Sequence, residues 1–261
     1  MQISIIGCGW LGLPLAKSLI QKGHEVIGST TSADKLKRLK EAGITPVQLK
    51  LEPMPVGEDF NLLFESELVI INIPPGRKKN PPHFYAEQIK YLKYQLQNSK
   101  VKKVIFISST SFYPNTNNTV DVNTNYDFAN GSSKAVVKGE EQISAISQEL
   151  IILRCGGLMG DDRIPGKWFA GKETQGADTP VNYVHRDDVI ATIEGLIEGW
   201  PKKQKVFNLV SDDHPTRKEV HERMAQKYGF ELPKWVEPST IQSKVVESSF
   251  KESRLKSPLN F

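Results

Sequence analysis

Short apolar runs recur along the first 155 residues of the chain. Each run holds about four to seven residues and is rich in isoleucine and valine. Runs of this kind are typical of strands that are buried on both faces of a parallel sheet. The expected strands are Ile3–Gly7, His24–Ser29, Glu67–Ile73, Lys103–Ser109 and Glu149–Arg154.

Helix-compatible segments separate these runs. The expected helices are Leu11–Lys22, Ala33–Ala42, His83–Asn98 and Ser132–Gln148. Strands that alternate with helices in this way predict an α/β fold with a doubly wound parallel sheet.

The pattern loosens after Arg154 into a segment punctuated by glycine and proline. Such segments often line ligand sites, so we expect a small cap or substrate-binding region here. A helix over Asp187–Gly199, a strand over Lys205–Val210 and a helix over Thr216–Tyr228 follow, and then a polar tail. We therefore expect a core over residues 1–155 and a mixed region over 156–261 that completes the sheet and forms the small substrate-binding part.

Length and charge narrow the class of protein. A chain of 261 residues can bury one substantial core. Its 34 basic and 30 acidic residues give a net charge of +4, which is too small to indicate a nucleic-acid partner. No apolar stretch approaches the roughly 20 residues that span a bilayer. The N-terminus lacks the pattern of a secretory signal, so we expect a cytoplasmic protein without a membrane partner.

Cysteine and histidine usage excludes further classes. The two cysteines, Cys8 and Cys155, cannot make a disulfide framework, and the five histidines lack metal-ligand spacing. We therefore expect no metal. The expected partner is a small-molecule substrate, and the chain is expected to be a monomer or a homodimer.

A GxGxxG motif stands at the end of the first expected strand and opens the first expected helix. It reads Gly7-Cys8-Gly9-Trp10-Leu11-Gly12. Gly7 allows a tight turn, Gly9 lets a pyrophosphate approach the backbone, and Gly12 lets the helix pack closely on the strand. The helix N-terminus adds free amides and a positive dipole end. The motif predicts a Rossmann fold in which Gly7, Gly9, Trp10, Leu11 and Gly12 bind a nicotinamide dinucleotide; the alternative is a glycine-rich turn without a ligand.

The end of the second expected strand bears on the choice between NAD and NADP. Folds that prefer NAD carry an acidic residue there, whose carboxylate bonds the ribose hydroxyls. The corresponding position in this chain is near Thr30. This chain has neutral donors and a cation instead, at Ser29, Thr30, Thr31, Ser32 and Lys35. That set suits a ribose 2′-phosphate, so NADP is favoured over NAD. The alternative is that Thr31 or Ser32 only caps the following helix.

A rigid loop follows the strand that ends near Asn72. It contains Ile73, Pro74 and Pro75 and lies at the carboxyl edge of the expected sheet, where such sheets bind ligands. We expect these three residues to face the cofactor. A stiff connection without ligand contact is the alternative.

Four segments together resemble the extended and atypical short-chain dehydrogenase/reductases, especially the branch similar to nucleoside-diphosphate-sugar epimerases. They are IIGCGWLGLPLA, NIPPGR, VIFISSTSFYP and VNYVHRDDV. In that superfamily a serine or threonine orients the substrate. A Tyr-x-x-x-Lys on the next long helix supplies the acid/base, and its lysine holds the nicotinamide ribose and lowers the tyrosine pKa. The resemblance implies that Ser109, four residues ahead of Tyr113, orients substrate and that Lys134 is the ribose-binding lysine.

The tyrosine of that pattern is missing. The family's Tyr-Gly-x-Ser-Lys reads Asn130-Gly131-Ser132-Ser133-Lys134 here, and none of the seven tyrosines has a lysine four residues later. An asparagine amide donates a hydrogen bond but cannot exchange a proton near neutral pH. Asn130 is therefore a candidate active-site residue that takes the place of the tyrosine but cannot act as its acid/base. Tyr113, also a candidate substrate contact, and Tyr126 are alternative phenols that loops could supply.

Three cations follow the last strand of the expected core. Arg154 ends that strand near where related enzymes meet the nicotinamide and the substrate, and Arg163 and Lys167 lie in the next loop. All three are candidate substrate-binding residues, because such groups receive phosphate; ordinary loop charges are the alternative. In VHRDDV, Asp187 or Asp188 most simply caps the next helix.

Two functions of different classes follow. The first is an NAD(P)-dependent oxidoreductase or epimerase/dehydratase-like enzyme that acts on a nucleotide sugar or a similar polar metabolite. The second is a dinucleotide-binding sensor or regulatory protein without redox turnover. Asn130 favours the sensor, whereas Ser109 and the loop after Arg154 favour the enzyme. A hydrolase is set aside because the chain has no G-x-S-x-G turn.

Overall fold

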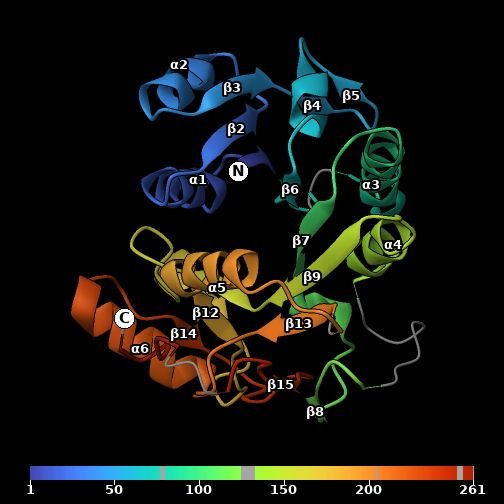
Figure 1. The fold of residues 1–261 in the computed structure, drawn as a ribbon. Helices are drawn as coiled ribbons and strands as arrows, with labels where there is room; N and C mark the ends of the chain where they lie inside the picture. The colour runs from blue at the N-terminus through green and yellow to red at the C-terminus, as the bar shows by residue number, and fades with distance from the viewer. Residues whose placement is uncertain (77–79, 125–132, 204, 252–254, 261) are drawn as a thin grey trace. The chain divides into compact units, whose positions relative to one another are not determined.

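A computed structural model of the chain describes residues 1–76, 80–124, 133–203, 205–251 and 255–260. The helices are α1 (Gly12–Gln21), α2 (Asp34–Glu41), α3 (Pro82–Gln97), α4 (Lys134–Ile143), α5 (Arg186–Glu198) and α6 (Arg217–Tyr228) (Figure 1). The strands of the main sheet are β1 (Gln2–Ile6), β2 (Glu25–Thr30), β3 (Thr45–Gln48), β6 (Leu68–Ile71), β7 (Lys103–Ser109), β9 (Glu149–Cys155) and β13 (Val206–Leu209).

Shorter elements complete the described chain. The remaining strands are β4 (Lys50–Leu51), β5 (Pro55–Val56), β8 (Thr119–Val120), β10 (Gly157–Met159), β11 (Glu173–Thr174), β12 (Tyr183–His185), β14 (Lys234–Trp235) and β15 (Val245–Val246). Short 3₁₀ helices are η1 (Phe60–Phe64), η2 (Thr110–Phe112) and η3 (Lys167–Phe169). No helix in the described ranges is both long and apolar enough to cross a membrane.

The main sheet has seven strands in the order β13-β9-β7-β6-β1-β2-β3. β1 pairs in parallel with β2 on one side and with β6 on the other, and the β2–β3 and β6–β7 pairs are also parallel. This arrangement confirms the expected doubly wound parallel sheet. The chain builds outward from β1 through β2 and β3 and then returns to β6, so the strand order reverses between β1 and β6. Ligands of such sheets bind at the carboxyl ends of the strands at this switch point.

The chain forms two compact units. The first consists of Met1–Ser108, Ser133–Leu153 and Ile193–Val206, and the second of Ser109–Ser132, Arg154–Thr192 and Phe207–Phe261. The chain passes between them several times, so no single boundary near residue 155 separates them.

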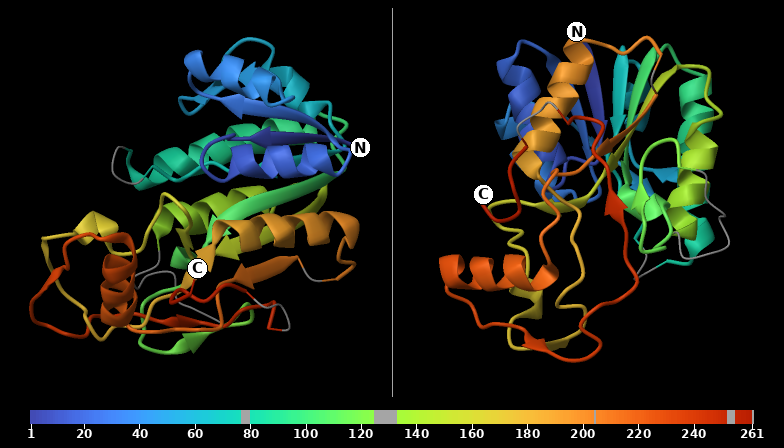
Figure 2. Two further views of the ribbon diagram at one scale, coloured as in Figure 1. Left: turned by 90° about the vertical axis from the view of Figure 1, so that its left-hand side faces the viewer. Right: turned by 90° about the horizontal axis from the view of Figure 1, so that it is seen from below.

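The first unit has three layers. Helices α1 and α2 cover one face of the strands, and α3 and α4 cover the other (Figures 1 and 2). The strands are apolar on both faces because both are covered. The core under α3 and α4 joins strand residues such as Ile71 and Phe106 to Ile89 and Leu96 of α3 and to Ile143 of α4.

The second unit has a smaller core around α6. Val220 and Met224 of α6 pack with Ile164 and Val181, and Tyr183, Phe230 and Leu259 cover this group. The second unit also contains three short parallel strand pairs, namely β10 with β12, β11 with β14 and β15 with β8.

One strand of the main sheet and the end of one helix differ from the sequence expectation, which also did not include the short strands outside the main sheet. β3 was not expected: it has four residues and pairs with the end of β2, but only Val47 among them is buried, so it has no apolar run. The helix expected over Ser132–Gln148 ends early, because α4 stops at Ile143. Ser144 takes its C-cap position, where short polar side chains compete with helical hydrogen bonds.

Candidate cofactor site at the glycine loop

The glycine loop after β1 is held from both neighbouring strands. The Gly7 amide donates to Ser29 Oγ at 2.9 Å, and the Cys8 amide donates to the Ser29 carbonyl at 2.8 Å. On the other side, Asn72 Nδ2 donates to the Gly7 carbonyl at 3.0 Å. The loop is therefore fixed at the switch point by residues that end β2 and follow β6.

Two of the three glycines are required by the protein's own geometry. Gly7 has φ of 106°, and a Cβ there would lie 2.4 Å from the carbonyl oxygen of Asn72. A Cβ on Gly12 would lie 2.2 Å from the carbonyl oxygen of Gly7. A side chain at either position would displace the backbone, which agrees with the tight turn and close packing predicted for them.

Gly9 is different. A Cβ at this position would meet nothing within 4 Å, and its φ is not in the left-handed region. Among the described residues, neither backbone conformation nor packing explains a glycine here. A ligand that must approach the backbone closely does explain it, which is the role of the middle glycine in a phosphate loop.

The N-terminus of α1 supplies the rest of the phosphate site. Helical hydrogen bonding begins in the loop, since the Leu13 amide donates to the Gly9 carbonyl at 3.0 Å. Leu11 takes the N-cap position and its side chain cannot accept from the first-turn amides, and the first turn has no acidic residue. The helix dipole and these amides favour an anion. The residues of the loop thus fit a dinucleotide pyrophosphate.

Cys8 is a packing residue of this loop. It is buried, and a Cβ on Gly28 would lie 2.5 Å from its sulfur. Burial raises the pKa of the Cys8 thiol to about 12, although a hydrogen bond to the Ser29 backbone opposes this. The thiol is therefore neutral and unsuited to nucleophilic chemistry.

The end of β2 presents some of the expected donors. Ser29 is buried and its hydroxyl oxygen serves the glycine loop, while Thr30 Oγ1 accepts from the Ser32 amide at 3.4 Å. Thr31 and Lys35 are exposed. The N-cap of α2 is Ala33, with no side-chain cap, so neither Thr31 nor Ser32 has the capping role considered as an alternative.

The loop after β6 lies beside the glycine loop. Ile73 Cγ2 is 3.5 Å from the position of a Cβ on Gly7, and the Ile73 carbonyl accepts from the Tyr85 hydroxyl at 3.3 Å. Pro74 is exposed and Pro75 half-buried. Sequence analysis places Asn72 at the start of this loop but gives it no role of its own, and its bond to Gly7 is the finding of the structure.

The candidate catalytic residues lie in different parts of the chain. Lys134 is the exposed first residue of α4 in the first unit. Ser109 is half-buried in the second unit, where its Oγ accepts from the Ser111 amide at 3.2 Å and lies 3.0 Å from Ser111 Oγ. Asn130 and Tyr126 lie outside the described residues.

Tyr113, considered above as a phenol that a loop could supply, has its hydroxyl engaged by other side chains. It is fully buried, and its hydroxyl donates to Asn208 Oδ1 at 2.8 Å and accepts from Arg154 Nη1 at 2.8 Å. The buried Arg154 guanidinium also lies 3.4 Å from the centre of the Phe112 ring. These contacts give Tyr113 and Arg154 a structural role in the second unit, and a substrate role for either stays a prediction.

The other two candidate cations are at the surface of the second unit. Arg163 and Lys167 are both exposed, and the backbone of Arg163 pairs with Gly160 in an isolated bridge. Their side chains are thus accessible. Among the described residues no group of three or more His, Cys, Asp or Glu could hold a metal ion.

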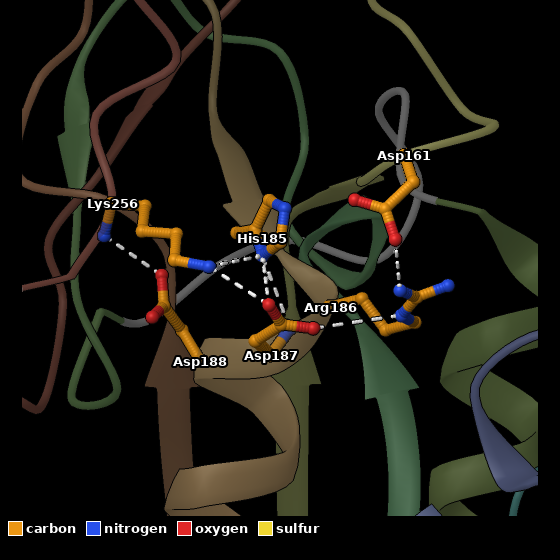
Figure 3. Close-up of polar contacts among 6 residues, drawn as sticks. All are labelled: Asp161, His185, Arg186, Asp187, Asp188 and Lys256. Carbon is orange, nitrogen blue, oxygen red and sulfur yellow. Dashed lines mark hydrogen bonds and ion pairs between the residues drawn. The ribbon is translucent and has the colours of Figure 1, made fainter. Parts of the chain in front are cut away.

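The VHRDDV segment holds the C-terminal region of the chain (Figure 3). Lys256 Nζ pairs with Asp187 Oδ2 at 2.8 Å, and the Lys256 amide donates to Asp188 Oδ2 at 2.7 Å. His185 is buried, and its Nδ1 accepts from the Asp187 amide at 3.2 Å. Burial, and then the Lys256 charge, lower the pKa of His185. These carboxylates therefore anchor residues 255–260, beyond the capping role expected for them.

The comparisons with known proteins agree with this fold. A family model described as the NAD binding domain of 6-phosphogluconate dehydrogenase matches residues 2–121, which include the glycine loop and Asn72. The fold and the loop thus define an α/β protein of the Rossmann type. The chain is 32% identical over 237 residues to Protein YeeZ of Escherichia coli strain K12, a match that covers 90% of this chain and 86% of that protein. The chain belongs to the YeeZ family.

Solved structures share the fold at low sequence identity. A functionally unknown conserved protein from Silicibacter pomeroyi DSS is 19% identical with a TM-score of 0.72, over 98% of this chain and 94% of that one. UDP-glucuronic acid 4-epimerase from Bacillus cereus, solved in complex with NAD, is 16% identical with a TM-score of 0.78, over 100% and 95% of the two chains.

Proposed function

We propose that the chain is an NAD(P)-dependent oxidoreductase or epimerase/dehydratase of the short-chain dehydrogenase/reductase type. Its substrate is a nucleotide sugar or a similar polar metabolite. The observation that carries the proposal is the open space at Gly9, which lies between two structurally required glycines at the N-terminus of α1. A ligand phosphate at this point accounts for a glycine that the fold itself does not need.

Lys134, Ser109 and Asn130 have different roles in this proposal. Lys134 holds the nicotinamide ribose and Ser109 holds the hydroxyl or carbonyl of the substrate, as the family resemblance implies. The bound dinucleotide supplies the hydride acceptor or donor. Asn130 cannot exchange a proton near neutral pH, so the proton passes through another group.

NADP is the favoured cofactor. No carboxylate stands at the end of β2, and the exposed Thr31 and Lys35 suit a 2′-phosphate. Their accessibility and the absence of side-chain capping at Ala33 support this preference. NAD is the alternative, since the B. cereus epimerase with the same fold was solved with NAD.

A phosphorylated substrate fits the second unit. Arg163 and Lys167 are exposed cations in the segment that follows β10, and both groups can receive a phosphate. The B. cereus protein of similar fold is a UDP-glucuronic acid 4-epimerase, which makes a nucleoside-diphosphate sugar the first class to screen.

Substitution at Gly9 tests the cofactor site. Gly9→Ala adds a methyl that meets no described protein atom, so the fold should persist while NADPH binding weakens at least about tenfold. Binding is measured by energy transfer from the four tryptophans to the reduced nicotinamide, with NADPH and NADH titrated separately. Gly195→Ala is the matched control, because its Cβ also meets nothing within 4 Å, and it should leave affinity unchanged.

Each outcome of this titration has a distinct meaning. Tight NADPH and weak NADH binding support the NADP assignment, and the reverse overturns only that choice. If wild-type protein binds neither at high micromolar concentration, or if Gly9→Ala binds as wild type does, the proposed cofactor site is wrong.

A sensor without redox turnover is the second candidate. It is favoured by Asn130 in place of the tyrosine and by the burial of Tyr113, whose hydroxyl bonds Asn208 and Arg154. Asn130→Tyr separates the two functions. An enzyme with a substrate site should gain carbonyl reductase activity, measured as the consumption of NADPH. A sensor should bind the cofactor and gain no such activity.

A further inference from the structure

Tyr85 bridges three elements of the first unit. It lies on α3 and is 3% exposed. Its hydroxyl donates to the Ile73 carbonyl at 3.3 Å. The edge of its ring lies against α4, where a Cβ on Gly139 would be 2.6 Å from Tyr85 Cε1 and 3.0 Å from Cδ1. A buried tyrosine therefore touches both the loop after β6 and the helix that begins at Lys134.

The hydroxyl of Tyr85 is a permanent donor. Burial, and then the charge of Glu140, raise the pKa of this phenol well above its ordinary value. The phenol therefore stays protonated near neutral pH and is poorly suited to serve as the missing acid. Its contribution is geometric.

The same contacts continue to the glycine loop. Asn72, next to Ile73, donates from its Nδ2 to the Gly7 carbonyl at 3.0 Å. Ile73 Cγ2 is 3.5 Å from the position of a Cβ on Gly7. A continuous set of contacts thus runs from Gly7 through Asn72 and Ile73 to Tyr85 and on to Gly139 of α4.

The far end of this set lies on the same helix as Lys134. Gly139 is five residues along α4 from Lys134, which is about one and a half turns of a rigid helix. The buried Glu140 next to it accepts from Ser108 Oγ at the end of β7. α4 can approach α3 this closely only because residue 139 has no side chain.

We propose that Tyr85 is a positioning residue of the cofactor site. It fixes the Ile73 carbonyl beside the glycine loop and seats α4, so that Lys134 stands at a set distance from the bound phosphates. This inference rests on the proposed function, because it assigns Tyr85 to the same dinucleotide site.

The test compares two tyrosines of the same helix. Tyr85→Phe removes only the hydroxyl and should weaken NADPH binding about threefold to tenfold, as expected for one lost hydrogen bond. Tyr94→Phe is the matched control, since Tyr94 is 62% exposed on α3, and it should bind as wild type does. Binding is read by tryptophan-to-nicotinamide energy transfer, which requires no turnover.

A double-mutant cycle separates positioning from general damage. Lys134→Met should weaken NADPH binding in the wild-type background and by a clearly smaller factor in the Gly139→Ala background, because the added methyl pushes α4 from the Tyr85 ring and displaces the lysine. Equal factors in the two backgrounds would show that the seating of α4 on Tyr85 does not act through Lys134. Gly139→Ala leaves the Tyr85 hydroxyl intact and should by itself weaken NADPH binding.

The outcomes distinguish a failure of the proposed role of Tyr85 from a failure of the proposed dinucleotide-binding function. Wild-type protein that binds no dinucleotide overturns both. Wild-type protein that binds NADPH, with Tyr85→Phe equal to Tyr94→Phe, overturns the role of Tyr85 alone.

Discussion

At the scale of single residues, His221 is placed where a charge is least tolerated. It is fully buried on α6, and its ring stacks between Phe169 at 5.7 Å and Trp235 at 5.6 Å. Neither of its ring nitrogens has a hydrogen-bond partner among the described residues. Burial, and then the positive charge of Arg217, lower the pKa of His221 to about 4. The imidazole is therefore neutral in the folded chain.

This burial predicts a loss of stability in acid. The pKa is about 4 when folded and 6.5 when unfolded, so between these values the unfolded chain binds more protons. The contribution of His221 is complete above pH 6.5 and falls by up to about 3 kcal/mol as the pH drops to 4. The difference between the free energies of urea unfolding at pH 7 and pH 4.5 measures this loss. In His221→Phe the difference should be smaller than in wild type. An unchanged difference would show that other groups cause the pH dependence.

The sequence alone predicts some residues of the candidate site but not others. Gly7, Gly9 and Gly12 are recognisable because their roles depend on the spacing of one local turn. Tyr85 was missed, and Asn72 was given no role of its own, because their contacts join segments that lie far apart in the sequence. Tyr113 was expected in a loop, since the sequence does not reveal the burial that Arg154 and Asn208 impose on it.

At the scale of elements, the buried strands of the main sheet and the helices between them were the most predictable. The runs at Ile3–Gly7, Glu67–Ile73 and Lys103–Ser109 correspond to β1, β6 and β7. β3 was missed because an edge strand of four residues with one buried side chain carries little hydrophobic signal. Bridging strands of two residues, such as β8 and β15, form through distant pairing and have no local pattern.

The start of α6 offers a test of local stabilisation. Thr216 Oγ1 accepts from the Glu219 amide at 3.2 Å, and the Glu219 carboxylate accepts from the Thr216 amide at 2.7 Å, which is a complete capping box. Thr216→Ala should lower the free energy of unfolding by about 1 kcal/mol. Urea denaturation measures the change. Thr216→Ser keeps the hydroxyl and should stay close to wild type; an equal loss in both variants would contradict capping as the cause.

At the scale of the whole molecule, each of the two units is made of three separate segments of the chain, which explains why the sequence did not predict their bounds. A linear division at residue 155 follows the point where the periodic pattern loosens, but contacts assign Ser109–Ser132 to the second unit and Ile193–Val206 to the first. Strands such as β7 end where one unit passes into the other, and no change of composition marks these points. The layers of the first unit were predictable because one rule, alternation of strand and helix, governs most of its length.

The open space at Gly9 also has a consequence for how such a chain changes over evolutionary time. A mutation that places a small side chain there meets no described protein atom, so proteases and chaperones that remove misfolded chains have nothing to detect. A lineage could lose cofactor binding in one step and still keep an intact, abundant protein. Under the proposed function, the residue at this position distinguishes family members that bind the dinucleotide from folded relatives that no longer bind it.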